Sequence, residues 1–111
     1  MMYMVTANEV AIYIVALGEI MIETKQLQYF IKCVELGSFS KAAEVLHTTQ
    51  PNVSKVIKTF EDELDIELFT RQRNAIVLNE NGRDVYEYAC DAMHSVQQIA
   101  DYVIEIKKKN S

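Results

Sequence analysis

The sequence predicts a mainly α-helical protein, in which three short helices and a small β-hairpin form one domain and a single long helix follows. Three observations support this prediction. Within residues 24–64, apolar side chains recur at helical spacing in segments separated by glycine and by capping residues. Between Glu67 and Asn79 an alternating pattern replaces that spacing. A heptad pattern without proline then continues to about Lys108.

The length and composition predict a single small domain with one extended element. The chain has 111 residues, of which 50% are hydrophobic, and this is too little for a second globular core. We expect an N-terminal extension at 1–20, a compact domain at 21–79 and the long helix at 80–111.

The origin of residues 1–20 has two interpretations. Met21 stands where an initiator is expected for the helix that follows, so the upstream stretch is either translated vector sequence or a misassigned start. Alternatively, an authentic extra helix begins near Asn8, because residues 10–17 are compatible with a helix and are too apolar to remain free in water.

The charge distribution leaves a nucleic-acid partner open. A net charge of −5 counts against such a partner if the protein is treated as a uniform sphere. Cations nevertheless occur in two places, Lys55 and Lys58 on one predicted helix and Arg71 and Arg73 in the loop after it. A phosphate backbone responds to the local face, so the acidic total does not exclude DNA binding. The acidic residues lie between these cations: Glu61, Asp62, Glu63, Asp65 and Glu67.

Nothing in the sequence predicts export or membrane insertion. The longest apolar stretch, residues 10–22, is interrupted by Gly18 and Glu19 and is shorter than a membrane span. It also lacks the basic start and the cleavage site of a signal peptide. Cys33 and Cys90 fall within predicted helices and lack the spacing of a disulfide scaffold. We therefore expect a protein of the reducing cytoplasm that does not contact a membrane.

The first two helices have recognisable ends. Thr24 can cap a helix at 25–36, and Gly37 follows its last turn, where glycine commonly ends a helix. The apolar positions of this helix are Leu27, Phe30, Ile31 and Val34. Ser38 or Ser40 can then open a short second helix. Its apolar residues leave room for another helix to approach closely: Ala42, Ala43 and Leu46.

A third helix begins after a turn of only a few residues, 47–49. Thr49 is a good N-cap, and Pro51 falls in the first turn, where its missing N–H costs nothing. Because the turn is short, the second and third helices must cross at a steep angle. The buried stripe is predicted to be Val53, Ile57, Phe60 and Leu64. Polar residues occupy the opposite face: Asn52, Ser54, Lys55, Lys58 and Thr59.

The hairpin and the long helix complete the domain order. Apolar residues flank a polar tip at 71–74, namely Leu68, Phe69, Ile76 and Leu78. Asn79 can cap the helix that follows, which would be roughly 43 Å long at 1.5 Å per residue. Apolar positions alternate four and three apart along this helix: Val85, Ala89, Ala92, Val96, Ile99, Val103 and Ile106. The domain is too small to cover that seam, so we expect a second copy of the chain to cover it in a homodimer.

The predicted order is helix, helix, short turn, helix and hairpin. This is the order of a winged helix-turn-helix, which binds DNA in many proteins and only protein in some modules. The residues at 27–82 resemble the N-terminal domain of LysR-type transcriptional regulators. The resemblance rests on Leu27, Tyr29, Phe30, Gly37, Ser38, Phe39, Ser40, Ala42, Ala43, Leu46, His47, Thr49, Gln50, Pro51, Val53, Ser54, Ile57, Glu61, Leu64, Leu68, Phe69, Arg71, Leu78 and Gly82.

The resemblance implies a recognition helix at 50–63 that lies in the major groove of DNA. The first two turns of such a helix reach the base edges, which makes Gln50, Asn52, Ser54 and Lys55 candidates for base contact rather than only solvated surface. Gln50 can donate to and accept from an adenine, whereas Lys55 can reach a guanine or a phosphate. The full set of candidate DNA-binding residues is Ser38, Ser40, Thr49, Gln50, Pro51, Asn52, Ser54, Lys55, Lys58, Arg71 and Arg73.

Some of these positions have a second interpretation or depart from the family pattern. Capping alone explains the hydroxyls of Ser38, Ser40 and Thr49, and Lys58 either contacts a phosphate or only lies near one. At the hairpin, Asn74 stands where the family usually has a basic residue, with Arg73 beside it. After the recognition helix, Asp65 replaces the family's glycine, and aspartate tolerates a left-handed cap less well.

We therefore expect sequence-specific DNA binding and transcription regulation by a homodimer, with no enzymatic activity and no cofactor. Cys90 and His94 lie one helical turn apart, but a zinc site needs three or four ligands, so packing explains them better. The family's effector-sensing domain would follow Ser111, so we expect either a fragment or a naturally short regulator, and we expect neither to bind a small-molecule effector. The alternative is an interaction protein that heterodimerises with full-length relatives through the long helix and antagonises them.

Overall fold

The structure is a computed structural model that describes residues 22–72 and 75–111. The two interpretations of residues 1–20, and the candidate role of Arg73 at the hairpin tip, concern positions outside the described residues. The elements within the described part are α2 (Thr24–Leu36), α3 (Phe39–Val45), α4 (Gln50–Leu64), β1 (Phe69–Gln72), β2 (Ala75–Leu78) and α5 (Glu80–Lys109).

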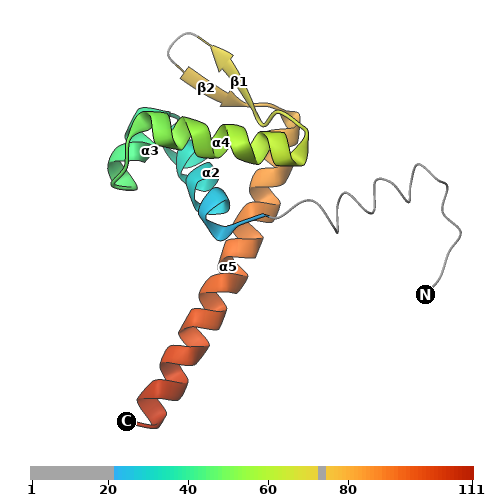
Figure 1. The fold of residues 1–111 in the computed structure, drawn as a ribbon. Coiled ribbons are helices and arrows are strands. Elements are labelled where there is room, and N and C mark those ends of the chain that lie inside the picture. The colour runs from blue at the N-terminus through green and yellow to red at the C-terminus, as the bar shows by residue number, and fades with distance from the viewer. Residues whose placement is uncertain (1–21, 73–74) are drawn as a thin grey trace, which may run out of the picture.

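The arrangement matches the predicted order of helices, hairpin and long helix. Helices α2, α3 and α4 pack together, the hairpin lies along one side of α4, and α5 projects from the domain as a rod (Figure 1). The two strands are antiparallel, and Phe69 pairs with Leu78 at the end of the hairpin next to the domain. The prediction of a mainly α-helical winged helix-turn-helix followed by a long helix is therefore confirmed.

Local capping explains where the helices begin. The backbone N–H of Lys41 donates to the hydroxyl of Ser38 at 3.1 Å, so Ser38 caps α3 and Ser40 lies inside that helix. The backbone N–H of Asn52 donates to the hydroxyl of Thr49 at 3.2 Å, as predicted for α4. The predicted cap of the long helix is also confirmed, because the Asn79 side chain accepts from the N–H of Gly82 at 2.8 Å.

One predicted cap is wrong. Helix α2 begins at Thr24 itself, and its N-cap is Glu23. The backbone N–H of Glu23 donates to Oε1 of Gln26 at 3.0 Å, which is half of a capping box. The glutamine three residues into the helix therefore moves the start by one residue. Gly37 ends α2 as expected, with a left-handed φ of 65°.

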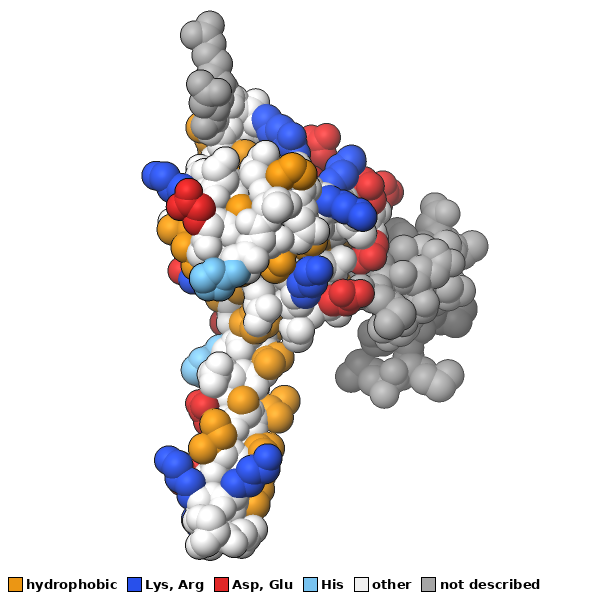
Figure 2. Space-filling model, turned by 60° about the vertical axis from the view of Figure 1, so that its left-hand side comes forward, with side chains coloured by type: hydrophobic (Ala, Val, Ile, Leu, Met, Phe, Trp, Pro, Cys, Tyr) orange, Lys and Arg blue, Asp and Glu red, His pale blue; other side chains and the backbone are white. Residues whose placement is uncertain are grey.

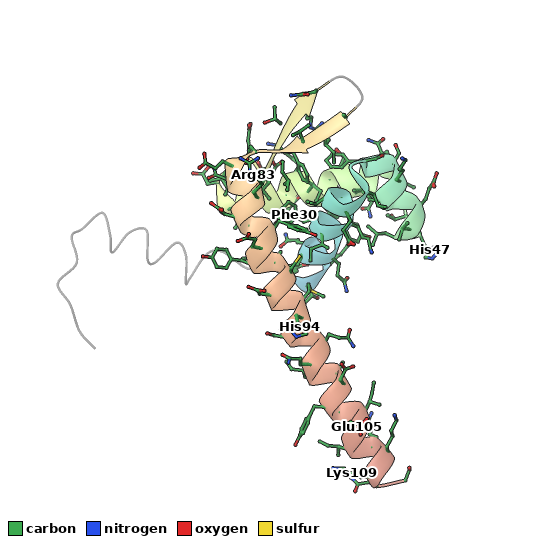
Figure 3. All side chains as sticks on the ribbon, turned by 180° about the vertical axis from the view of Figure 1, so that it is seen from behind. Phe30, His47, Arg83, His94, Glu105 and Lys109 are labelled. Atoms are coloured by element: carbon green, nitrogen blue, oxygen red, sulfur yellow. The ribbon has the colours of Figure 1, made fainter. Side chains whose placement is uncertain are left out.

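An aromatic cluster holds the helices, the hairpin and the long helix together. Phe30 of α2 lies at its centre (Figure 3), with its ring centroid 5.9 Å from that of Phe60, 5.5 Å from that of Phe69 and 6.3 Å from that of Tyr86. Because these partners belong to α4, β1 and α5, one ring connects four elements. The other fully or nearly buried apolar residues are Cys33, Phe39, Ala42, Ala43, Val53, Ile57, Leu68 and Ala89.

Helix α5 has two parts. Near its start, Val85 and Tyr86 pack against the core and Ala89 is 3% exposed. Farther along, Val96 is 39% exposed and Ile99 is 65% exposed, and apolar side chains continue down the projecting rod (Figure 2). The domain thus covers the first two positions of the predicted seam, and the part that remains uncovered begins at Ala92.

Candidate nucleic-acid interface

Packing of α4 decides which of its side chains face outward. Val53, Ile57 and Phe60 are buried at the predicted stripe, and this orients the opposite face toward solvent. Lys55 is exposed on that face, and Gln50 is exposed in the first turn. Asn52 and Ser54 are only half-exposed, so the first turns of α4 present fewer free side chains than the sequence pattern indicates.

A cleft of about 430 Å³ lies where the starts of α3 and α4 meet the hairpin. It brings together four of the predicted DNA-binding residues: Ser38, the N-cap of α3, Ser40 within α3, Gln50 from α4 and Arg71 from β1. The remaining lining residues are Gly37, Phe39, Gln72, Ala75 and Ile76. Three separate segments of the sequence therefore form one polar surface.

Arg71 contacts an aromatic ring, that of Phe39, which is not among the predicted site residues. Its guanidinium carbon lies 5.4 Å from the ring centroid of Phe39, which is a cation–π distance. Phe39 in turn packs edge-on against Phe69, with 5.8 Å between the centroids. The sequence signal for Phe39 was only its place in the family pattern, because a contact across this separation cannot be read from local spacing.

A second groove, of about 590 Å³, runs between the middle of α4 and β1. Ser54 and Lys58 line it from the helix and Arg71 lines it from the strand. Lys58 is not a free cation, because its Nζ lies 3.0 Å from Oδ1 of Asp62. The hydrogen bond and charge of Asp62 raise the pKa of Lys58. A phosphate must therefore compete with Asp62 for this lysine.

Asn52 and Lys55 lie on the other side of α4, toward α2. Both line a hollow of about 210 Å³ between the two helices. The side-chain amide of Asn52 donates to the hydroxyl of Thr48 at 2.9 Å, so one of its donors is already used. Pro51 is exposed at the start of α4, beside Thr49. The predicted contacts thus fall on both flanks of the helix rather than on a single line.

The described residues offer little to support other chemistry. Burial raises the pKa of the Cys33 thiol to about 12, so at neutral pH Cys33 is a packed, uncharged side chain. No three His, Cys, Asp or Glu residues in the described part lie close enough together to hold a metal ion. None of the helices in the described part has the length and apolar composition of a membrane span.

Comparison with known protein families and sequences identifies the family of this domain. The family model of "Bacterial regulatory helix-turn-helix protein, lysR family" matches residues 24–83, which is more than half of the chain. The "Nitrogen assimilation regulatory protein nac" of Klebsiella aerogenes is 36% identical over 74 residues, covering 67% of this chain and 24% of that protein. The "Uncharacterized HTH-type transcriptional regulator YxjO" of Bacillus subtilis (strain 168) is 43% identical over 75 residues, covering 68% and 26%. The chain spans about a quarter of the length of these curated relatives.

Solved structures agree with the family match. The DNA-binding domain of BenM in complex with catB site 1 DNA superimposes with a TM-score of 0.74 at 34% identity, covering 77% of this chain and 96% of that chain. The domain of CbnR in a DNA complex gives a TM-score of 0.72 at 28% identity, covering 77% and 98%. Full-length BenM gives 0.68 at 35% identity, covering 72% of this chain and 26% of that chain. The chain therefore belongs to the LysR family of bacterial helix-turn-helix regulators, and residues 24–83 form its helix-turn-helix domain.

Proposed function

We propose that this protein binds specific DNA sequences as a homodimer and thereby regulates transcription. The observation that carries the proposal is the cleft that collects Ser38, Ser40, Gln50 and Arg71 from three elements beside the exposed start of α4. Family membership supports DNA as the ligand of that cleft, since two of the similar structures are complexes of related domains with DNA. No observation favours the alternative of an antagonist that heterodimerises, and we propose no catalytic role.

The roles of the side chains follow from where each one can reach. The start of α4 enters the major groove, where Gln50 hydrogen-bonds a base edge. Arg71 on the hairpin contacts the DNA backbone, and the hydroxyls of Ser38 and Ser40 donate to phosphate on the α3 side. Lys55 contacts a base or a phosphate on the α2 side of α4. Lys58 contributes less than its charge indicates because Asp62 already pairs with it.

The dimer is proposed to form through the uncovered part of α5. In this arrangement residues 21–79 bind DNA and residues 80–111 join the two copies. The supporting observation is that Val96, Ile99, Val103 and Ile106 remain at least 39% exposed at heptad spacing. Two copies give two recognition helices, which fits a site made of two half-sites.

The test divides DNA affinity into a specific part and a nonspecific part. A preferred site is first recovered by in vitro selection. Gln50→Ala then costs about 1 to 3 kcal/mol on this site and little on random DNA, because it removes a base contact. Arg71→Ala weakens binding to both DNAs equally and lowers the salt slope by about one unit, because it removes a phosphate contact. Titration of each variant at several salt concentrations gives both quantities.

Lys55→Ala decides between the two roles left open for that residue. A loss confined to the preferred site indicates base contact, and an equal loss on both DNAs indicates phosphate contact. Lys108→Ala is the charge control, because it removes an exposed cation in the last turn of α5. Equal losses on both DNAs for Gln50→Ala contradict the proposed orientation of α4, and a chain that binds no selected DNA contradicts the proposed function.

A further inference from the structure

Glu61 links the recognition helix to the start of the hairpin. Its side-chain Oε2 accepts hydrogen bonds from the backbone N–H of Leu68 at 2.7 Å and from that of Phe69 at 3.5 Å. The first bond is short, as expected when the acceptor is a carboxylate. One oxygen of a side chain on α4 therefore holds two consecutive amides where the chain enters β1.

These two amides belong to the part of the hairpin that anchors Arg71. Leu68 is fully buried, and its carbonyl accepts from the N–H of Asn79 at 3.0 Å, so both of its backbone groups are bonded. Phe69 packs on Phe39, and Arg71 lies on the same strand face two residues later with its guanidinium over the same ring. The position of Arg71 thus depends on the orientation of β1 relative to α4.

Glu61 is a negatively charged residue among candidate DNA contacts, where its charge alone would weaken DNA binding. It lines the groove that Ser54, Lys58 and Arg71 also line, where a negative charge opposes the approach of DNA. Glu67 lines the same groove, and within the described residues its side chain makes no hydrogen bond or ion pair. The two glutamates therefore differ in bonding while sharing charge and location, which makes Glu67 a matched control.

We infer that Glu61 is a positioning residue, whose carboxylate sets the hairpin against the recognition helix and so directs Arg71 toward the DNA backbone. The inference rests on the proposed function, because it needs DNA as the ligand. The inference predicts the direction in which DNA affinity changes when Glu61 is removed. If Glu61 is only a surface charge, removing it strengthens DNA binding, whereas if it positions Arg71, removing it weakens binding.

The experiment compares Glu61→Ala, Glu61→Asp and Glu67→Ala with the wild type, each titrated with one random-sequence duplex at several salt concentrations. Glu67→Ala binds more tightly because it removes a repulsive charge. Glu61→Ala binds more weakly and loses about one unit of salt slope, which equals the loss in Arg71→Ala. Combining Glu61→Ala with Arg71→Ala lowers the slope no further, since both changes remove the same contact.

Glu61→Asp keeps the inference testable if the alanine variant folds poorly. It preserves the charge and shortens the side chain by one methylene, so a loss of slope in this variant reports geometry alone. Amide hydrogen exchange in the absence of DNA gives a second measurement, in which protection at Leu68 falls in Glu61→Asp and is unchanged in Glu67→Ala.

Three results overturn the inference: Glu61→Ala binding more tightly in the manner of Glu67→Ala, Glu61→Asp retaining the full slope, or protection at Leu68 unaffected by Glu61→Asp. The proposed function fails separately, because in that case the wild type itself does not bind DNA.

Discussion

At the residue scale, Gly82 shows how closely the long helix approaches the loop before the hairpin. A Cβ atom at this position would lie 2.1 Å from the carbonyl oxygen of Leu68 and 2.6 Å from Cδ2 of Leu78. The first of these neighbours is backbone, so it cannot move aside without displacing the start of β1. Gly82 therefore permits α5 to begin against the domain, and flexibility is not its role.

We predict that Gly82→Ala destabilises the protein by about 2 to 3 kcal/mol or more, because the clash forces the backbone apart. Gly37→Ala is the control, since nothing lies within 4 Å of its Cβ position and only its φ of 65° is unfavourable for alanine. That strain costs about 1 to 2 kcal/mol. Urea denaturation of both variants measures the difference, and an equal or larger loss in Gly37→Ala contradicts the account.

Asp65 is a strained residue where the family has glycine. It ends α4 with a left-handed φ of 57°, and its negative charge lies at the helix C-terminus, where the dipole disfavours it. We predict that Asp65→Gly stabilises the protein by about 0.5 to 1 kcal/mol through relief of both effects. Asp65→Asn removes the charge but keeps a side chain, so a larger rise in melting temperature for Asp65→Gly than for Asp65→Asn measures the backbone strain that a side chain causes. An unchanged melting temperature in Asp65→Gly would contradict the prediction.

At the level of single elements, α5 packs against the domain near its start and is exposed over the rest of its length. The turn of α5 around Val85 and Ala89 packs in the core, and this fixes the direction in which the rod leaves. In Figure 3 His94, Glu105 and Lys109 lie along the projecting part, well away from Phe30. An apolar stripe on such a rod is stable in water only if another surface covers it.

We predict that Val96→Lys combined with Ile99→Lys converts the protein to monomers, because charged side chains replace the centre of the uncovered seam. The domain itself remains folded, since neither residue belongs to its core. Ile104→Lys is the control, because Ile104 is 50% exposed and falls outside the heptad positions. Sedimentation at tens of micromolar measures the state of each variant. A wild type that sediments as a monomer would refute the seam as a dimer interface.

At the scale of the whole molecule, the net charge of −5 is a poor guide to the DNA-facing surface. Within the described residues, the candidate contacts are mostly neutral, Arg71 on the hairpin and Lys55 on α4 form no ion pair, and Lys58 pairs with Asp62. We therefore expect few phosphate contacts per subunit, and an affinity that depends on the dimer to add them together.

We predict that a chain beginning at Met21 binds the selected DNA as the full chain does. The described elements of the domain begin at Thr24, Gln26 is bonded to Glu63 at 3.0 Å, and every candidate contact comes later in the sequence. Parallel titration and thermal melting of the two chains test this. Weaker DNA binding would contradict the prediction, and a large drop in melting temperature with binding intact would mean that the extension stabilises the domain.

The elements, their order and most of their ends could be predicted from the sequence, because they depend on residues three or four apart. The caps at Thr49 and Asn79 and the buried stripe of α4 are such local features. The cap of α2 at Glu23 is equally local, but threonine is a preferred N-cap residue and glutamate is not, so the sequence pattern favours Thr24. Family resemblance supplied the candidate DNA contacts, which no spacing rule yields.

How these candidates lie relative to one another depends on tertiary packing and could not be predicted from the sequence. The contacts of Arg71 with Phe39 and of Glu61 with Leu68 join residues from different elements, and both depend on the angles at which those elements pack. The division of the α5 seam at Ala89 likewise depends on how far the domain reaches along the rod. Periodicity predicts which face of an element is buried. It does not predict which neighbour covers that face, so the arrangement of the site could be derived only from the folded chain.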